Sequence, residues 1–299
     1  MKLATYRHAG NGERLGVIDN NEVVDVSSLD SRLPTSMTDL LRAGKGGMNA
    51  LRSALNGMGH RVPLADVTLS APVPRPIKFL GLGANYGRHL AEFAKSHAPE
   101  RMPSTKVQHW FNKQVGCIIG PHDAIHLPHC STQLDFEAEL GLVIGTRCRH
   151  VPPERAFEMI AGYVVCNDVS VRDWQAISPT GMMGKSFDTH GPVGPWLTTA
   201  DEIEDPQSLR VRTWIDADLR QDGNTREFIH KIPQMISFLT TAFTLEPGDI
   251  LSTGSPAGVG SAEVPPRYLK AGQRCRIEIE GLGEINNLII DEPESTKMP

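Results

Sequence analysis

The sequence has no CxxC pair, no long hydrophobic run and no excess of basic residues. Its five cysteines are odd in number and scattered, which argues against a disulfide framework or a thiolate zinc site and favours a cytoplasmic location. No stretch approaches the roughly 20 apolar residues of a membrane span, and the N-terminus lacks the apolar segment of a signal peptide. Lys and Arg number 30 against 35 Asp and Glu, so neither nucleic acid nor a membrane is expected as a partner.

The composition is that of a globular protein with room for two domains. The chain has 299 residues, of which 39% are hydrophobic and 22% are charged. Alternating prolines in residues 71–76 (APVPRP) predict a stiff, extended connector. We therefore expect a small N-terminal domain over residues 1–70 and a main domain over residues 71–299.

Short strands dominate the local patterns. The 28 glycines and 22 prolines indicate many turns. Residues 15–26 predict a hairpin and residues 134–144 a single alternating strand, while residues 153–160 and 232–243 predict helices. Runs of strands with scattered helices favour an α+β fold over a doubly wound parallel sheet.

Three segments resemble binding motifs but lack a required feature. In Gly81-Leu-Gly-Ala-Asn-Tyr86 a tyrosine replaces the third glycine of the dinucleotide-binding fingerprint. In Gly184-Lys-Ser the glycine that a phosphate-binding loop requires five positions earlier is Pro179. The histidines at 122, 126 and 129, with the cysteine at 130, match no standard zinc spacing, so surface histidines are the better interpretation.

Acidic residues alternate along the predicted strand at 134–144. Asp135, Glu137 and Glu139 would share one face, about 6.7 Å apart in succession, so that two of them could bind one cation. A solvated strand face is the alternative. Asp168 follows another short strand and could supply a third oxygen ligand. Such an all-oxygen set selects magnesium, manganese or calcium.

A histidine and a glutamate are predicted to share a helix face. Asn85 is a plausible helix N-cap, and from it His89 and Glu92 stand three residues apart. A carboxylate beside an imidazole raises its basicity and suits a general base, although a surface pair has the same spacing. The glycine-rich residues 253–260 follow a strand-like run and could direct backbone N–H groups at a carboxylate or form a plain turn.

Five co-linear motifs resemble the fumarylacetoacetate hydrolase family, and the N-terminal unit is similar to the small extra domain of many bacterial members. The motifs are GLGANYGRHLAE (81–92), LDFEAELGLVIG (134–145), GYVVCNDVSVRDWQ (162–175), GKSFDTHGPVGPW (184–196) and GDILSTGSPAGVG (248–260). The resemblance implies a mixed β-sheet rolled into a barrel-like core, and a homodimer.

The resemblance also implies roles for individual residues. Magnesium or manganese would be bound by Glu137, Glu139 and Asp168. The catalytic dyad, on a lid, would be His89 and Glu92, and the substrate would contact Lys185, Gln175 and Ser255. Two positions depart from the family pattern: serine at 255 replaces the usual threonine, and Leu82 stands where some members have a further aspartate ligand.

These observations predict a metal-dependent hydrolase that cleaves a C–C bond in an acylpyruvate or related 1,3-diketo acid. His89 would deprotonate the attacking water, and Lys185 would either stabilise a developing oxyanion or form a buried ion pair with a site acid. One alternative retains the site and changes the reaction to decarboxylation of oxaloacetate or isomerisation of an unsaturated keto acid. A non-catalytic keto-acid binder is a third possibility.

Overall fold

The structure is a computed structural model that describes residues 1–57, 59–96 and 104–297. Within them the strands form a twelve-stranded sheet, a five-stranded sheet and a two-stranded pair. The large sheet runs in the order β4 (Arg61–Pro63), β3 (Glu22–Asp25), β2 (Arg14–Asp19), β1 (Lys2–Arg7), β14 (Gly191–Thr199), β12 (Ile160–Asn167), β11 (Ala138–Ile144), β17 (Ile250–Ser252), β6 (Phe79–Gly83), β7 (His109–Lys113), with β5 (Thr68–Ser70) on β1 and β8 (Ile118–Ile119) on β14.

The second sheet packs against the middle of the first. Its order is β16 (Asp218–Asn224), β15 (Arg210–Ile215), β18 (Arg274–Ile279), β19 (Gly283–Asp291), β9 (Ile125–Leu127), and the separate pair is β10 (Leu134–Asp135) with β13 (Ser170–Val171). One hydrophobic cluster takes fully buried side chains from both sheets, among them Leu140, Val211 and Ile277. This shared core explains why buried and partly exposed positions alternate in β15 and β18, whereas β11, in the middle of the large sheet, is buried throughout.

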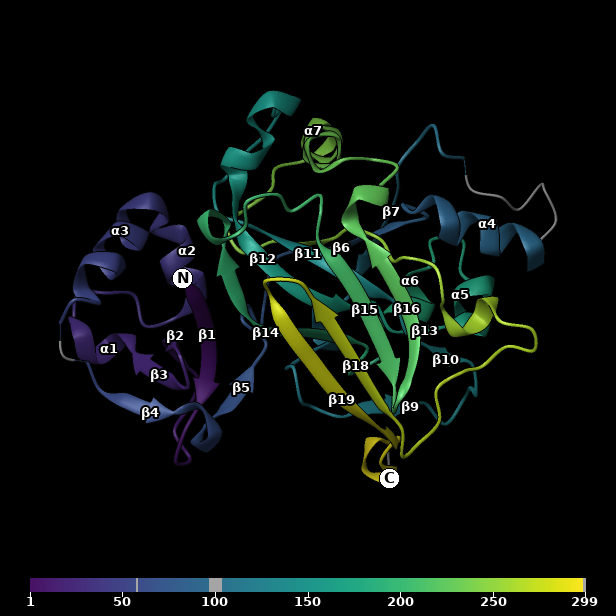
Figure 1. The fold of residues 1–299 in the computed structure, drawn as a ribbon, viewed down its shortest axis with the longest axis horizontal. Helices are drawn as coiled ribbons and strands as arrows, with labels where there is room; N and C mark the ends of the chain where they lie inside the picture. The colour runs from purple at the N-terminus through teal and green to yellow at the C-terminus, as the bar shows by residue number, and fades with distance from the viewer. Residues whose placement is uncertain (58, 97–103, 298–299) are drawn as a thin grey trace.

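Helices are short and lie around the sheets (Figure 1). The α-helices are α1 (Val26–Leu29), α2 (Met37–Arg42), α3 (Gly44–Ala54), α4 (Gly87–Ser96), α5 (Arg172–Ile177), α6 (Met182–Lys185) and α7 (Ile232–Ala242). The 3₁₀ helices are η1 (Leu64–Asp66), η3 (Val115–Cys117), η4 (Pro153–Met159), η5 (Ala200–Glu202), η6 (Thr225–Glu227), η7 (Gly260–Ala262) and η8 (Glu294–Thr296).

The fold class is α+β with mixed sheets, as expected. Pairs such as β17 with β6 are parallel, whereas β11 with β12 is antiparallel. In the described residues the large sheet ends at β4 and β7, so its strand order does not close a barrel.

The N-terminal elements lie together on one side of the molecule (Figure 1). β1 pairs antiparallel with β14, so the N-terminal strands and the strands of the main part of the chain belong to one sheet. A second core cluster likewise joins Leu40 and Leu51 of the N-terminal part to Val143 and Val164. The domain division at residue 70 stays a prediction.

Local predictions are confirmed where turn and cap residues define them. β2 and β3 form the expected hairpin with Asn20 in a left-handed conformation at the turn, and α7 matches the helix expected at 232–243. The segment after Pro152 is a 3₁₀ helix instead of an α-helix, and the strand expected at 134–144 is interrupted after Asp135.

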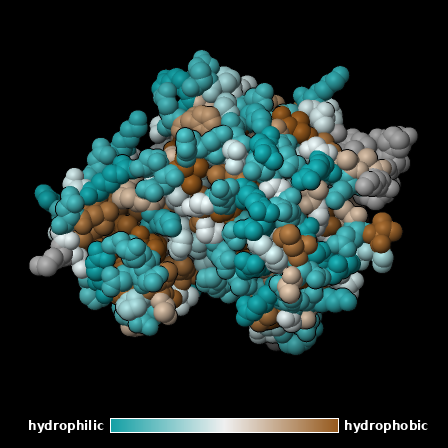
Figure 2. All heavy atoms as spheres, in the orientation of Figure 1, coloured by the Kyte–Doolittle hydropathy of each residue, from teal (hydrophilic) through white to brown (hydrophobic). Residues whose placement is uncertain are grey.

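The visible surface is mainly hydrophilic, with hydrophobic side chains in small groups (Figure 2). Among the described residues, no helix is long and apolar enough to cross a membrane.

Candidate metal centre

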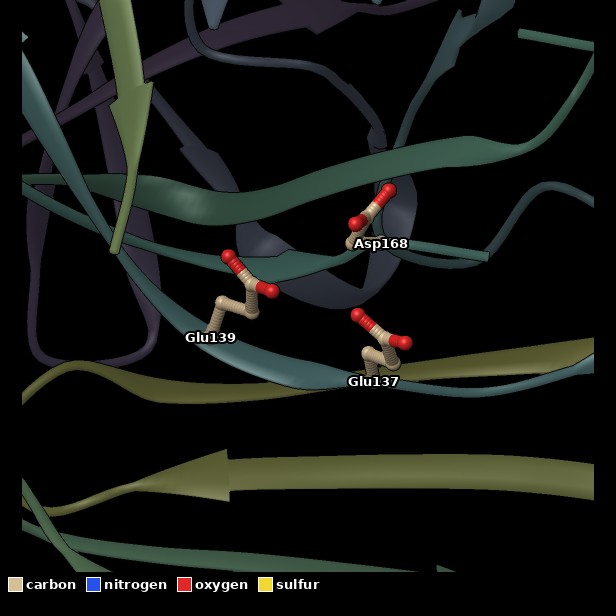
Figure 3. A group of neighbouring side chains, drawn as sticks. All are labelled: Glu137, Glu139 and Asp168. Carbon is tan, nitrogen blue, oxygen red and sulfur yellow. The ribbon is translucent and has the colours of Figure 1, made fainter. Parts of the chain in front are cut away.

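Three carboxylates converge beside the middle of the large sheet. Glu137, Glu139 and Asp168 each offer an oxygen, and these oxygens all lie within 4.8 Å of one another. Figure 3 shows the three side chains pointing toward a common space. All three are buried, and Glu139 is only 1% exposed. Their burial excludes the solvated strand face that the alternating pattern also allowed.

The backbone explains why these side chains meet. Glu139 lies in β11 opposite Cys166 of β12, while Glu137 and Asp168 lie just beyond the ends of the paired strands. The Asp168 N–H donates to the Glu137 carbonyl at 2.9 Å, and the Glu137 N–H donates to Asn167 Oδ1 at 3.1 Å. The ladder is thereby continued past the strand ends, which holds the two carboxylates next to each other.

Asp135 does not join this group. The interruption between β10 and β11 turns its side chain toward Arg172, whose Nε donates to Asp135 Oδ2 at 2.8 Å. Backbone N–H groups of Gly260 and Ser261 donate to the same carboxylate at 2.7 and 3.0 Å. The expectation that all three acids would share one face fails because strand alternation does not continue through the break.

Cations surround the carboxylates: Lys113 and Lys185 are buried, and Arg172 is partly buried. Lys185 Nζ donates to Glu137 Oε2 at 2.9 Å and to Asp168 Oδ2 at 2.6 Å. Lys113 Nζ donates to Asp168 Oδ1 at 2.7 Å and also to the Lys185 carbonyl. Arg172 Nη1 lies 2.6 Å from Glu137 Oε1. Every charge in this network therefore has an opposite charge in contact, as burial demands, except that of Glu139.

Glu139 instead accepts two neutral hydrogen bonds. Ser252 Oγ and the Gly254 N–H donate to its Oε2 at 2.6 and 2.8 Å. Burial, together with the nearby charges of Asp168 and Glu137, raises the pKa of Glu139 well above its usual value. Burial acts in the same direction on Glu137, but Lys185 and Arg172 outweigh it and hold the pKa of Glu137 well below its usual range.

The donor set fits a hard divalent cation. Three buried carboxylates offer converging oxygens. Burial first, and then repulsion from Asp168 and Glu137, raise the pKa of Glu139, and a bound cation would offset both effects. Carboxylate oxygens without sulfur or imidazole are the ligands that Mg²⁺ and Mn²⁺ prefer. The chain therefore has a site suited to a divalent metal.

α4 carries the predicted dyad close to this site. His89 Nδ1 lies 3.9 Å from Glu92 Oε2, and a charge on His89 lowers the pKa of Glu137. Asn85 is not the N-cap of α4; its buried amide donates to the Thr253 carbonyl, and its Oδ1 accepts from the His230 N–H. Asn85 thus anchors the chain at the start of the helix.

The glycine-rich segment 253–260 connects the dyad to the carboxylates. Gly254 contacts Glu139 as described, and the Gly258 N–H donates to Glu92 Oε2 at 2.9 Å. Gly258 has a φ of +104°, and a Cβ there would lie 2.0 Å from the Arg220 carbonyl oxygen. Only glycine allows this N–H to reach the helix. Ser255 is buried, and its Oγ accepts from Gln221 Nε2 at 2.8 Å.

The remaining predicted residues lie on α5 and α6. Lys185 is in the buried ion pair that was one of its two expected roles, and Gln175 Oε1 accepts from Arg172 Nη1 at 3.0 Å. Sequence reasoning missed Lys113 and Arg172 as members of the network. Arg172 stands within the quoted motif 162–175, but Lys113 lies in a mixed polar strand with no pattern that singles it out.

Comparison with known proteins decides the family. A family model described as "Fumarylacetoacetate (FAA) hydrolase C-terminal" matches residues 78–290. The chain belongs to the fumarylacetoacetate hydrolase family. The similarity extends beyond residues 78–290. A relative from Xenopus laevis, named as a mitochondrial oxaloacetate tautomerase, is 37% identical over 296 residues. The aligned region covers 97% of this chain and 90% of the relative.

Solved structures of similar proteins cover nearly the whole chain. Maleylpyruvate hydrolase from Sphingobium sp. SYK-6, crystallised with manganese(II) and pyruvate, is 34% identical with a TM-score of 0.81, over 98% of this chain and 100% of the other. A 2-hydroxyhepta-2,4-diene-1,7-dioate isomerase from Mycobacterium marinum is 28% identical with a TM-score of 0.76, at the same coverage. Hydrolases, tautomerases and isomerases thus all occur among relatives of this family member.

Proposed function

We propose that this protein is a divalent-metal-dependent hydrolase that cleaves the C–C bond of an acylpyruvate or a related 1,3-diketo acid and releases pyruvate or a similar keto acid. The observation that carries the proposal is the meeting of three buried carboxylates with a histidine–glutamate pair on the adjacent helix. The similarity to a maleylpyruvate hydrolase crystallised with manganese(II) and pyruvate supports it.

The charges of the site favour an anionic keto acid. Four buried carboxylates (Asp135, Glu137, Glu139 and Asp168) face two buried lysines (Lys113 and Lys185) and the partly buried Arg172. A divalent ion and one substrate carboxylate would together bring one positive charge, which balances this excess. Mg²⁺ or Mn²⁺, held by Glu137, Glu139 and Asp168, would supply Lewis-acid stabilisation of negative charge on the keto oxygens.

His89 would act as the general base. Its Nδ1 faces Glu92 at 3.9 Å, so Nε2 is the nitrogen that would take a proton from water. This distance is too long for a hydrogen bond, and catalytic contacts of this kind often shorten only when substrate is bound. Glu92 would orient the imidazole and stabilise its protonated form. Lys185, Gln175 and Ser255 stay proposed substrate contacts, and Lys185 would share its ammonium between the acids and a developing oxyanion.

A second function is favoured by one comparison. The 37% identity to an oxaloacetate tautomerase suggests enol–keto conversion, or the related decarboxylation or isomerisation, on the same site. These reactions need a proton taken from or given to carbon and no attacking water. His89 would then move a proton between two substrate atoms.

An assay with product identification separates the two functions. Purified protein with Mg²⁺ or Mn²⁺ is tested against acylpyruvates, fumarylpyruvate and oxaloacetate, and products are identified by NMR. We expect cleavage into two acids, with incorporation of one water. Proton exchange at carbon without cleavage would favour the tautomerase instead.

His89→Ala tests the base directly. We expect hydrolysis to fall by about 10²- to 10⁴-fold, the usual contribution of a general base, with metal still bound. His60→Ala, at an exposed histidine far along the sheet from this helix, is the matched control. Full turnover by His89→Ala would exclude His89 as the base.

We also propose that the protein is a cytoplasmic homodimer. Sedimentation velocity over a range of concentrations tests the assembly: we expect a species of twice the 32.7 kDa chain mass, and a species of the chain mass at all concentrations would contradict it.

A further inference from the structure

We propose that Arg88 and Glu227 form a clamp that positions α4, and with it His89, against the carboxylate site. The inference rests on the proposed function, because it assigns His89 the role of base. Arg88 would be a positioning residue that acts through the helix and does not touch substrate.

The clamp has the geometry of a two-point ion pair. Arg88 Nε donates to Glu227 Oε2 at 2.9 Å, and Arg88 Nη2 donates to Glu227 Oε1 at 3.2 Å. Arg88 Nη2 also donates to the Asp222 carbonyl at 3.1 Å. The paired, planar arrangement fixes orientation as well as distance, which a single contact would not do.

The glutamate side of the clamp is itself fixed. Glu227 ends η6, and its Oε1 accepts from the Asn224 N–H in a capping box. The next residue, Phe228, packs edge-to-face on Tyr86 at 5.2 Å and forms a bridge with it. Tyr86 directly precedes α4. The clamp therefore joins the first turn of the helix to the segment 227–228, which already contacts the residue before the helix.

Glu92 makes another contact that fixes α4, and it also takes part in the proposed chemistry. Glu92 Oε2 accepts from Gly258 at 2.9 Å and lies 3.9 Å from His89 Nδ1. Arg88 and Glu92 stand four residues apart, so both contacts act on the same helix face. If Glu92 turned toward His89, its contact with the Gly258 N–H would weaken. The Arg88–Glu227 pair would keep the first turn of α4 in place independently of Glu92.

A double-mutant cycle tests the clamp. The variants are Arg88→Gln, Glu227→Gln and both together; glutamine at 227 retains an oxygen for the Asn224 N–H and loses the charge. Arg155→Gln is the matched control, because Arg155 forms a similar exposed two-point pair with Glu158 of η4, and neither residue contacts α4 or the clamp in the described structure. The readouts are kcat and KM for cleavage and deuterium exchange of residues 87–96.

We expect each single variant to lower kcat about two- to fivefold, which is the range that the free energy of an exposed ion pair supports. KM should be unchanged, and deuterium exchange in α4 should be faster. The double variant should lose no more than either single variant, and Arg155→Gln should match the wild type. Losses that multiply in the double variant, or faster exchange with unchanged kcat, would overturn the proposal. Should the wild type turn over no substrate, the proposed function fails, and the exchange rates still decide whether the pair holds the helix.

Discussion

Glu139 differs from the other two carboxylates of the site in having neutral hydrogen-bond donors where they have ammonium or guanidinium groups. The spacing of Glu137 and Glu139 predicted that both could bind one cation, but Glu137 lies before β11 and is placed by its backbone bonds to Asn167 and Asp168. Lys185 was expected to pair with a site acid, whereas Lys113 and Arg172 were not predicted as partners of Asp168 and Glu137. Local sequence patterns carry no information on such tertiary pairs.

Glu139→Gln should act in opposite directions on metal binding and on stability. Loss of a ligand charge should abolish Mn²⁺ binding in calorimetric titration. In the metal-free protein at a pH above the raised pKa of Glu139, glutamine can still accept from Ser252 and Gly254 without the buried charge, so the free energy of unfolding should rise by about 1 kcal/mol. Glu154→Gln, at an exposed glutamate of η4, is the control. Unchanged Mn²⁺ affinity in Glu139→Gln would refute its assignment as a ligand.

Metal binding should release protons. Burial and the neighbouring acids raise the pKa of Glu139, so below that raised pKa the metal must displace a proton from this carboxyl. Metal affinity should therefore increase with pH. Calorimetry in two buffers of different ionisation enthalpy counts the protons released; an enthalpy independent of the buffer contradicts the prediction.

At the scale of the elements, the break between β10 and β11 decides which acids meet. The predicted continuous strand was wrong at residues 136–137, where the chain leaves the ladder and sends Asp135 toward Arg172 and η7. The hairpin at residues 15–26 was predictable because its turn residues are local. The 3₁₀ form of η4 and the true role of Asn85 depend on contacts made by segments far along the chain.

Gly258→Ala should separate the glycine-rich segment from α4. A side chain there meets both a left-handed backbone, which costs about 1–3 kcal/mol, and the Arg220 carbonyl oxygen at 2.0 Å. Gly272 is also left-handed, at a φ of +89°, but has nothing within 4 Å of its Cβ position. Thermal unfolding should show a larger loss for Gly258→Ala than for Gly272→Ala, and only the former should lose activity. Equal losses in the two variants would mean that the contact with Arg220 is unimportant.

At the scale of the whole molecule, two facing sheets bury the charge network, and the large sheet extends into the N-terminal elements. The α+β class followed from the many short strands, whereas the pairing of β1 with β14 could not be foreseen, because it joins segments nearly 200 residues apart. The division at residue 70 stays a prediction, and the structure adds that the N-terminal strands share a sheet with the rest of the chain.

Acid should destabilise the protein partly through His190. Burial lowers its pKa to about 3, while the unfolded chain has an ordinary histidine pKa of about 6.5. Between these values the unfolded chain binds more protons, so stability falls as pH drops through this window, by up to about 1.4 kcal/mol per pH unit. His190→Gln can still donate to the His126 carbonyl and should show a shallower loss from pH 6 to pH 4 in chemical denaturation. An unchanged slope would exclude His190 as a source of the dependence.

The central claim is that a divalent ion bound by the three carboxylates holds a pyruvate-like fragment. Paramagnetic relaxation of ¹³C-labelled pyruvate tests it most directly, because Mn²⁺ shortens the relaxation times of carbons bound close to it. The account predicts strong relaxation of the carboxylate and keto carbons with wild-type protein and Mn²⁺, and none above the free-ion level with Glu139→Gln. Equal relaxation with the two proteins would contradict it.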